Sequence, residues 1–80
     1  MKTTARTVRR VDGRWLNKAI GQRVLALRKQ RGLTAEQVGI GVGVTRAAVS
    51  NWELGNHGFP IETIYNIALF YGVSPRKLLP

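Results

Sequence analysis

The stretch that decides the fold is AEQVGIGVGVTRAAVSNWEL, residues 35–54. Apolar side chains recur in it at spacings that place them on one side of two short helices. These inward residues are Val38, Val42, Val44, Val49 and Trp52. Gly39 supplies the small residue needed where the first helix touches the second, and Gly43 supplies a residue that tolerates positive φ in the turn. The stretch therefore predicts two short helices that cross at a steep angle.

Two helices joined by such a turn form a helix-turn-helix, a unit that places its second helix in the major groove of DNA. The quoted residues resemble the helix-turn-helix of the lambdoid phage repressors and Cro proteins, the Xre family. The resemblance runs from about Ile20 to Leu79. It implies an all-α fold, a compact five-helix lambda repressor-like domain in which helices 2 and 3 form the helix-turn-helix.

The residues before this stretch predict a helix and a basic arm. Leu16, Ile20, Val24 and Leu27 recur at helical spacing, which favours a helix over residues 15–30. Residues 1–14 show no helical apolar pattern, and the pair Asp12-Gly13 is typical of a turn. We therefore expect a flexible basic arm over residues 1–14 and a helix-turn-helix domain over residues 15–80. The arm carries Arg6, Arg9, Arg10 and Arg14.

Capping residues mark the other helices. Thr34 and Gln37 form a capping box before the second helix, and Thr45 is placed to cap the third. A fourth helix is expected over residues 61–71, and Ser74 followed by proline predicts a short fifth helix that holds residues 76–79. The side chains expected to point inward from the fourth helix are Ile61, Ile64, Ile67, Ala68 and Tyr71.

The chain is strongly basic, with a net charge of +9 that is concentrated in residues 1–31. A polyanion is the partner that such a charge favours. The chain has no cysteine and one histidine, so we expect no disulfide, no metal site and no cofactor. No apolar run approaches the ~20 residues of a membrane helix. We also expect no small-molecule substrate and no enzyme activity, because no group of nucleophile, base and orienting residue emerges.

The outward face of the third helix carries the residues expected to read bases. By the resemblance, these are Arg46, Ala47, Ser50 and Asn51. Arginine can donate two hydrogen bonds to guanine, asparagine can pair with adenine, and an alanine methyl can meet the thymine methyl. A phosphate contact is the alternative for Arg46, and a solvated face is the alternative for Ser50 and Asn51. For Ala47 the alternative is a residue that only favours the helix.

Phosphate contacts are expected at helix starts and in the loop after the third helix, because free backbone N–H groups attract anions. The candidates are Thr34, Gln37, Thr45, Asn56 and His57. The chain departs from the family at Ala35, where a phosphate-binding glutamine is common. The arm arginines are further candidates, for a neighbouring groove or for nonspecific attraction of any polyanion.

The resemblance also implies a salt bridge between Arg28 and Glu53, which would orient the third helix. Together these features predict a sequence-specific regulator of transcription that binds double-stranded DNA, of the phage or prophage repressor or Cro type. It would act in a bacterial cytoplasm or nucleoid, or in a phage-infected cell, as a homodimer on a palindromic operator. The alternatives are a protein-interaction module, such as an antitoxin or a transcriptional bridging factor, and a basic RNA-binding module.

Overall fold

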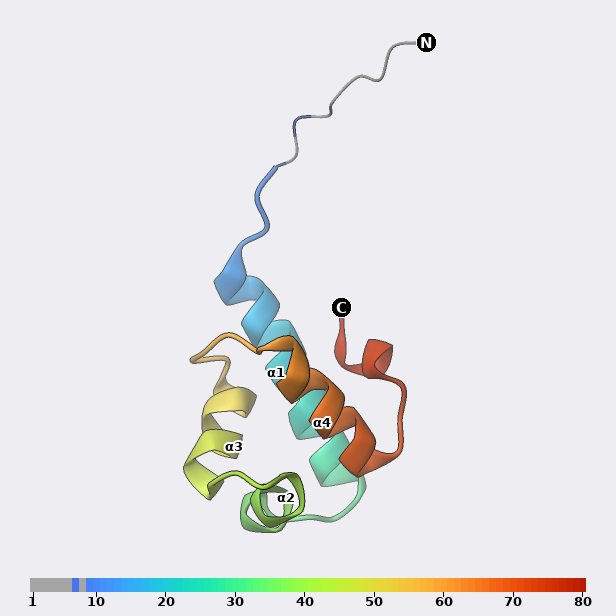
Figure 1. The fold of residues 1–80 in the computed structure, drawn as a ribbon. Coiled ribbons are helices and arrows are strands. Elements are labelled where there is room, and N and C mark those ends of the chain that lie inside the picture. The colour runs from blue at the N-terminus through green and yellow to red at the C-terminus, as the bar shows by residue number, and fades with distance from the viewer. Residues whose placement is uncertain (1–6, 8) are drawn as a thin grey trace.

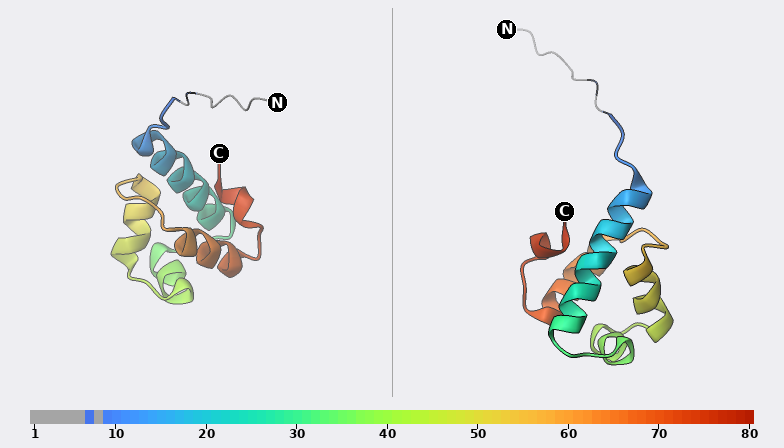
Figure 2. Two further views of the ribbon diagram at one scale, coloured as in Figure 1. Left: turned by 45° about the horizontal axis from the view of Figure 1, so that its top comes forward. Right: turned by 180° about the vertical axis from the view of Figure 1, so that it is seen from behind.

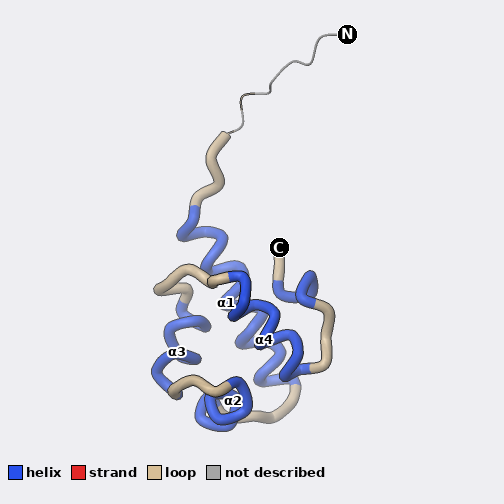
Figure 3. Tube along the Cα trace, in the orientation of Figure 1, coloured by secondary structure: helices blue, strands red, loops and turns tan. Residues whose placement is uncertain are grey.

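The computed structural model describes residue 7 and residues 9–80. This part of the chain contains four α-helices and one short 3-10 helix (Figure 1). The helices are α1 (Gly13–Gln30), α2 (Ala35–Val42), α3 (Arg46–Leu54) and α4 (Ile61–Tyr71), followed by η1 (Pro75–Leu78). Within this part there is no strand, and short loops join the helices (Figure 3). The predicted all-α class is confirmed. The expected fifth helix is a single 3-10 helix of four residues.

The first helix begins earlier than expected. The Asp12 carboxylate accepts a hydrogen bond of 2.9 Å from the backbone N–H of Arg14, so Asp12 caps α1 and is not part of a separate turn. Arg14 therefore lies in the first turn of α1 and not in an arm. Arg9 and Arg10 precede the helix and are exposed, whereas Arg6 lies outside the described residues.

The caps of α2 and α3 are confirmed. Thr34 Oγ1 accepts from the backbone N–H of Gln37 at 3.1 Å, and the Gln37 side chain accepts from the backbone N–H of Thr34 at 2.8 Å. Thr45 Oγ1 accepts from the backbone N–H of Ala48 at 3.0 Å. Between the two helices, Gly43 has a φ of +86°, the left-handed conformation that favours glycine. Local sequence thus sets both ends of the turn.

The core lies where all five elements meet, with α1 between α3 on one side and η1 on the other (Figures 1 and 2). Its buried side chains are Ile20, Val24, Val38, Val49, Trp52, Ile64, Ile67, Ala68, Tyr71 and Leu78. The inward assignment of Ile61 is wrong, since its side chain is 61% exposed. Ile61 shares a four-residue spacing with the exposed Tyr65 and Leu69, so it lies on the outer face of α4.

Helices α1 and α3 approach each other closely at a glycine. A Cβ atom added to Gly21 would lie 2.2 Å from the backbone carbonyl oxygen of Trp52, far inside contact distance. Gly39 has a similar role in α2, where an added Cβ would lie 2.8 Å from the Val44 carbonyl oxygen. The expected need for a small residue at position 39 is confirmed. These contacts fix how α3 sits on the rest of the domain.

Candidate nucleic-acid interface

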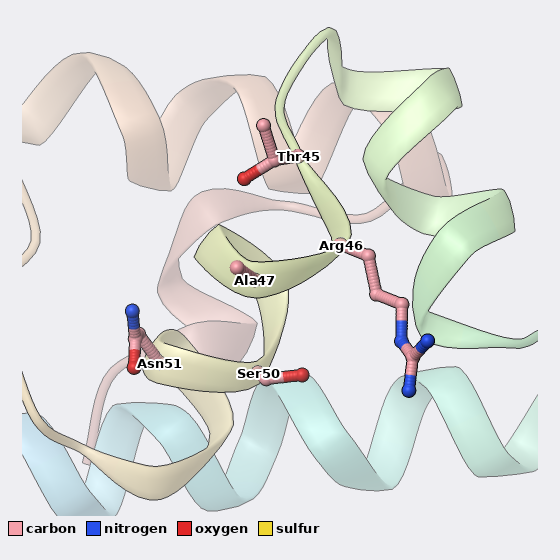
Figure 4. Close-up of a pocket in the computed structure, with 5 residues that line it drawn as sticks. All are labelled: Thr45, Arg46, Ala47, Ser50 and Asn51. Atoms are coloured by element: carbon pink, nitrogen blue, oxygen red, sulfur yellow. The ribbon is translucent and has the colours of Figure 1, made fainter.

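The two faces of α3 are clearly separated. Val49 and Trp52 are buried in the core. On the other face, Arg46 and Ala47 are exposed, and Ser50 and Asn51 are half-buried. Together with Thr45 they line one shallow, open hollow on the surface (Figure 4). The structure thus brings together on one outward face the four residues that were expected to read bases.

Asn51 is held by the loop that follows its helix. The Asn56 side-chain N–H donates to Asn51 Oδ1 at 3.3 Å, and the backbone N–H of Asn56 donates to the Asn51 carbonyl at 3.1 Å. Asn56, which was expected at a phosphate, therefore braces Asn51. The amide N–H groups of Asn51 stay available on the outward face, and His57 is exposed in the same loop.

The start of α2 adjoins the start of α3. Arg46 lines a second hollow, with Arg28, Leu33, Thr34, Ala35 and Glu36. The capping box uses the hydroxyl oxygen of Thr34 and the amide oxygen of Gln37 as acceptors, which leaves the hydroxyl proton and the side-chain N–H groups free to donate. Thr34 and Gln37 thus keep the donors that an anion requires, as does the hydroxyl of Thr45.

A basic side chain that the sequence reasoning did not select lies at the opposite end of α3. Lys18 and Arg14 line a hollow with Gly55 and Asn56. The contact is close, because a Cβ added to Gly55 would lie 2.8 Å from Cα of Lys18. The sequence shows that residues 1–31 are basic, but this pattern does not identify which of the basic side chains lie beside α3. Cations therefore flank α3 at both ends.

The ion pair expected between Arg28 and Glu53 is present and connects α1 to α3. Arg28 Nε lies 2.6 Å from Glu53 Oε2, and Nη2 lies 3.0 Å from Oε1. Arg28 Nη1 also donates to the Leu33 carbonyl at 3.0 Å. The pair is mostly shielded from solvent, with side-chain exposures of 18% and 9%. It ties the end of α3 to the segment that leads into α2.

The ion pair also affects the titration of neighbouring groups. The hydrogen bonds that Arg28 donates to the Glu53 carboxylate raise the pKa of Arg28, and the charge of Glu53 adds to this. Burial raises the pKa of the Tyr71 hydroxyl, with a further contribution from Glu53 in the same direction. Arg28 and Tyr71 therefore keep their protons throughout the physiological pH range.

The described residues contain no group of three or more histidine or acidic side chains that could hold a metal ion. In the same part of the chain, no helix combines the length and the apolar character needed to cross a membrane.

A family model described as HTH_3, helix-turn-helix, matches residues 24–78. A curated protein of Sinorhizobium fredii, the uncharacterized HTH-type transcriptional regulator y4dJ, is 31% identical over 64 residues, which are 80% of this chain and 83% of that protein.

Two solved structures are similar in fold and in sequence. The restriction-modification controller protein C.AhdI from Aeromonas hydrophila has a TM-score of 0.80 and 28% identity, and the match covers 86% of this chain and 100% of that one. The P22 c2 repressor, solved in complex with a synthetic operator, has a TM-score of 0.70 and 30% identity, with coverage of 75% and 91%.

Proposed function

The chain belongs to the HTH_3 helix-turn-helix family, and we propose that it regulates transcription by sequence-specific binding to double-stranded DNA. In this proposal it is a repressor or Cro-like protein of the phage or prophage type. It binds a palindromic operator as a homodimer, with α3 in the major groove. It acts in the bacterial cytoplasm or nucleoid, or on DNA in a phage-infected cell.

The observation that carries the proposal is the outward face of α3. Its residues are accessible, short or polar, and they border an open hollow rather than a second layer of protein (Figure 4). The P22 c2 repressor, which shares this fold, was solved with an operator. A face of this composition suits the edges of bases. A protein partner would favour a continuous apolar surface instead.

The side chains of α3 match the groups that bases present in the major groove. Asn51 pairs with adenine through its amide, which Asn56 already holds in place. The methyl group of Ala47 meets the methyl group of thymine, and the Ser50 hydroxyl donates or accepts. Each good bidentate pair contributes about 1–3 kcal/mol of discrimination against the wrong base.

Phosphate contacts surround this face. The capped starts of α2 and α3 present free donors from Thr34, Gln37 and Thr45 to the DNA backbone. At the other end of α3, Lys18 and Arg14 join Asn56 and the neighbouring His57. The arginines before α1, which are Arg6, Arg9 and Arg10, add charge that follows an adjacent groove. Such contacts position the domain and make its affinity depend on salt.

The outer face of α4 supports the proposed homodimer. Ile61, Tyr65 and Leu69 recur every four residues and are 61%, 53% and 77% exposed. Three large apolar side chains in one line on a small domain are typical of a surface that is covered by a partner. We propose that a second copy covers it, which spaces two α3 helices by about one DNA turn, ~34 Å.

Selection of duplexes from a random pool tests the proposed function. At about 150 mM salt, where contacts to phosphate alone are weak, we expect the wild-type chain to enrich one palindromic motif. The Asn51→Ala variant should lose the preference at its adenine position. Failure to enrich any motif, with binding that vanishes as salt rises, would contradict sequence-specific recognition.

Sedimentation velocity with and without the enriched duplex tests the homodimer. We expect two copies on each duplex, and we expect Leu69→Asp to bind as a monomer with weaker affinity, because a buried carboxylate costs several kcal/mol. Ser74→Asp, at the exposed start of η1, adds the same single negative charge and is the control. A single wild-type copy on the duplex at all concentrations would contradict the homodimer.

A further inference from the structure

Arg46 differs in direction from Ala47 and Asn51 on the outward face. Figure 4 shows its side chain extending away from these two residues, on the side where α2 lies. It lines the second hollow, where α1, α2 and α3 meet. Its guanidinium group therefore lies beside the edge of the face, at the start of α2.

None of the residues around this hollow bonds to the guanidinium group. Ala35, the first residue of α2, has only a methyl group and offers it no hydrogen bond. Arg28, which lines the same hollow, is already neutralised by Glu53 and bonded to the Leu33 carbonyl. Among the described residues, Arg46 itself forms no ion pair and no side-chain hydrogen bond. Its charge is thus available to an outside anion.

We propose that Arg46 binds a backbone phosphate at this hollow, and that base identity is read by Ala47, Ser50 and Asn51. A guanidinium group matches the geometry of a phosphate and forms strong, charge-assisted hydrogen bonds with it. Glu36 lines the same hollow and its negative charge opposes an anion, so the contact depends on the charge of Arg46 and not on the helix end alone. The inference rests on the proposed function, because it assigns a role within that DNA interface.

The two roles differ in what they do to specificity. A phosphate contact carries no base information, so its loss weakens binding to all duplexes alike. The loss of a guanine contact changes the preference at one position by roughly tenfold or more. The salt dependence differs as well, because each phosphate contact adds about 0.9 to the slope of log affinity against log salt.

The experiment compares Arg46→Ala with Arg76→Ala in the full chain. Arg76 lies on η1, on the far side of α1 from α3 (Figure 2). Each of the two variants loses one positive charge. Affinity is measured between about 50 and 300 mM salt for the wild-type duplex and for each single-base change in it. We expect Arg46→Ala to lower the slope by about 0.9 relative to Arg76→Ala, with the ranking of sequences unchanged. We expect Arg46→Lys to recover most of the slope.

Two results would overturn the inference. One is a relaxed preference at any base position in Arg46→Ala, whatever the slope. The other is a slope equal to that of Arg76→Ala. If the wild-type chain shows no preferred sequence, the proposed function fails, and the slope measured on an arbitrary duplex still decides the role of Arg46. A lower slope then supports the phosphate contact, and an equal slope overturns it.

Discussion

The side of α3 that faces α1 is closed by backbone contact at Gly21 and by the Arg28–Glu53 ion pair, whereas the opposite side carries accessible short side chains. This helix of nine residues thus has an inner side that fixes its orientation and an outer side that no other described element covers. Changes on the inner side should affect stability and DNA binding together. Changes on the outer side should affect DNA binding alone.

The largest effect is expected at Gly21, where the inner side is tightest. Gly21→Ala places a Cβ atom 2.2 Å from the Trp52 carbonyl oxygen, so α1 and α3 must move apart. We expect a loss of more than ~3 kcal/mol in the free energy of unfolding, beyond the usual cost of an overpacked core. Gly13→Ala is the control in the same helix, because no atom lies within 4 Å of its added Cβ. Chemical denaturation measures both variants, and equal stabilities would contradict the close approach of α1 and α3.

Glu53→Ala tests the ion pair on the same side. It leaves Arg28 shielded from solvent without its carboxylate partner. Because the pair is not fully buried, we expect the free energy of unfolding to fall by an amount at the lower end of ~3–5 kcal/mol, the range for breaking a buried ion pair. This corresponds to a Tm decrease of roughly 10 °C or more in a domain of this size. Glu62→Ala, which removes an exposed carboxylate, should cost less than about 1 kcal/mol. An unchanged Tm in Glu53→Ala would show that the pair does not hold α3 in place.

Thr45 lies at the boundary between the two sides and should give a smaller effect. Thr45→Ala removes the hydrogen bond from the Ala48 N–H to Oγ1. We expect a loss of about 1 kcal/mol in stability and a weaker affinity for all duplexes. Thr45→Ser keeps the hydroxyl and should restore both quantities. If Thr45→Ser is as unstable as Thr45→Ala, the capping hydrogen bond is not the cause.

Asn56 should give the smallest effect, confined to DNA binding. Asn56→Ala removes the donor that orients Asn51 and leaves the core unchanged. Stability should change by less than about 0.5 kcal/mol, as is usual for surface substitutions, while the preference at adenine falls by roughly 1 kcal/mol or less. His57→Ala is the control in the same loop. A preference that falls equally in both variants would indicate that the loop acts as a whole.

Much of this asymmetry could be predicted from the sequence, because local chemistry sets it. Threonine followed three residues later by glutamine favours one capping geometry, and glycine is the residue type that most easily adopts the positive φ of position 43. The burial of Val49 and Trp52 followed from helical spacing, which in turn placed Ser50 and Asn51 outward. The pairing of Arg28 with Glu53 came from the family resemblance.

The remaining features depend on contacts between distant residues. Asp12-Gly13 fits either a turn or a helix start, and only the bond to the Arg14 N–H decides between them. The need for glycine at position 21 comes from the Trp52 carbonyl, which is far away in the chain. The direction of Arg46 depends on what surrounds it at the start of α2. Sequence spacing contains none of this information.

Amide NMR spectra of the full chain, recorded as duplex DNA is added, test most directly whether the outer side of α3 meets DNA. The account predicts that the largest chemical-shift changes fall on residues 34–37, 45–51 and 56, at the starts of α2 and α3 and on the outward face. Residues of η1, on the far side of α1, should change little. Shifts concentrated on η1, with α3 unchanged, would contradict the central claim.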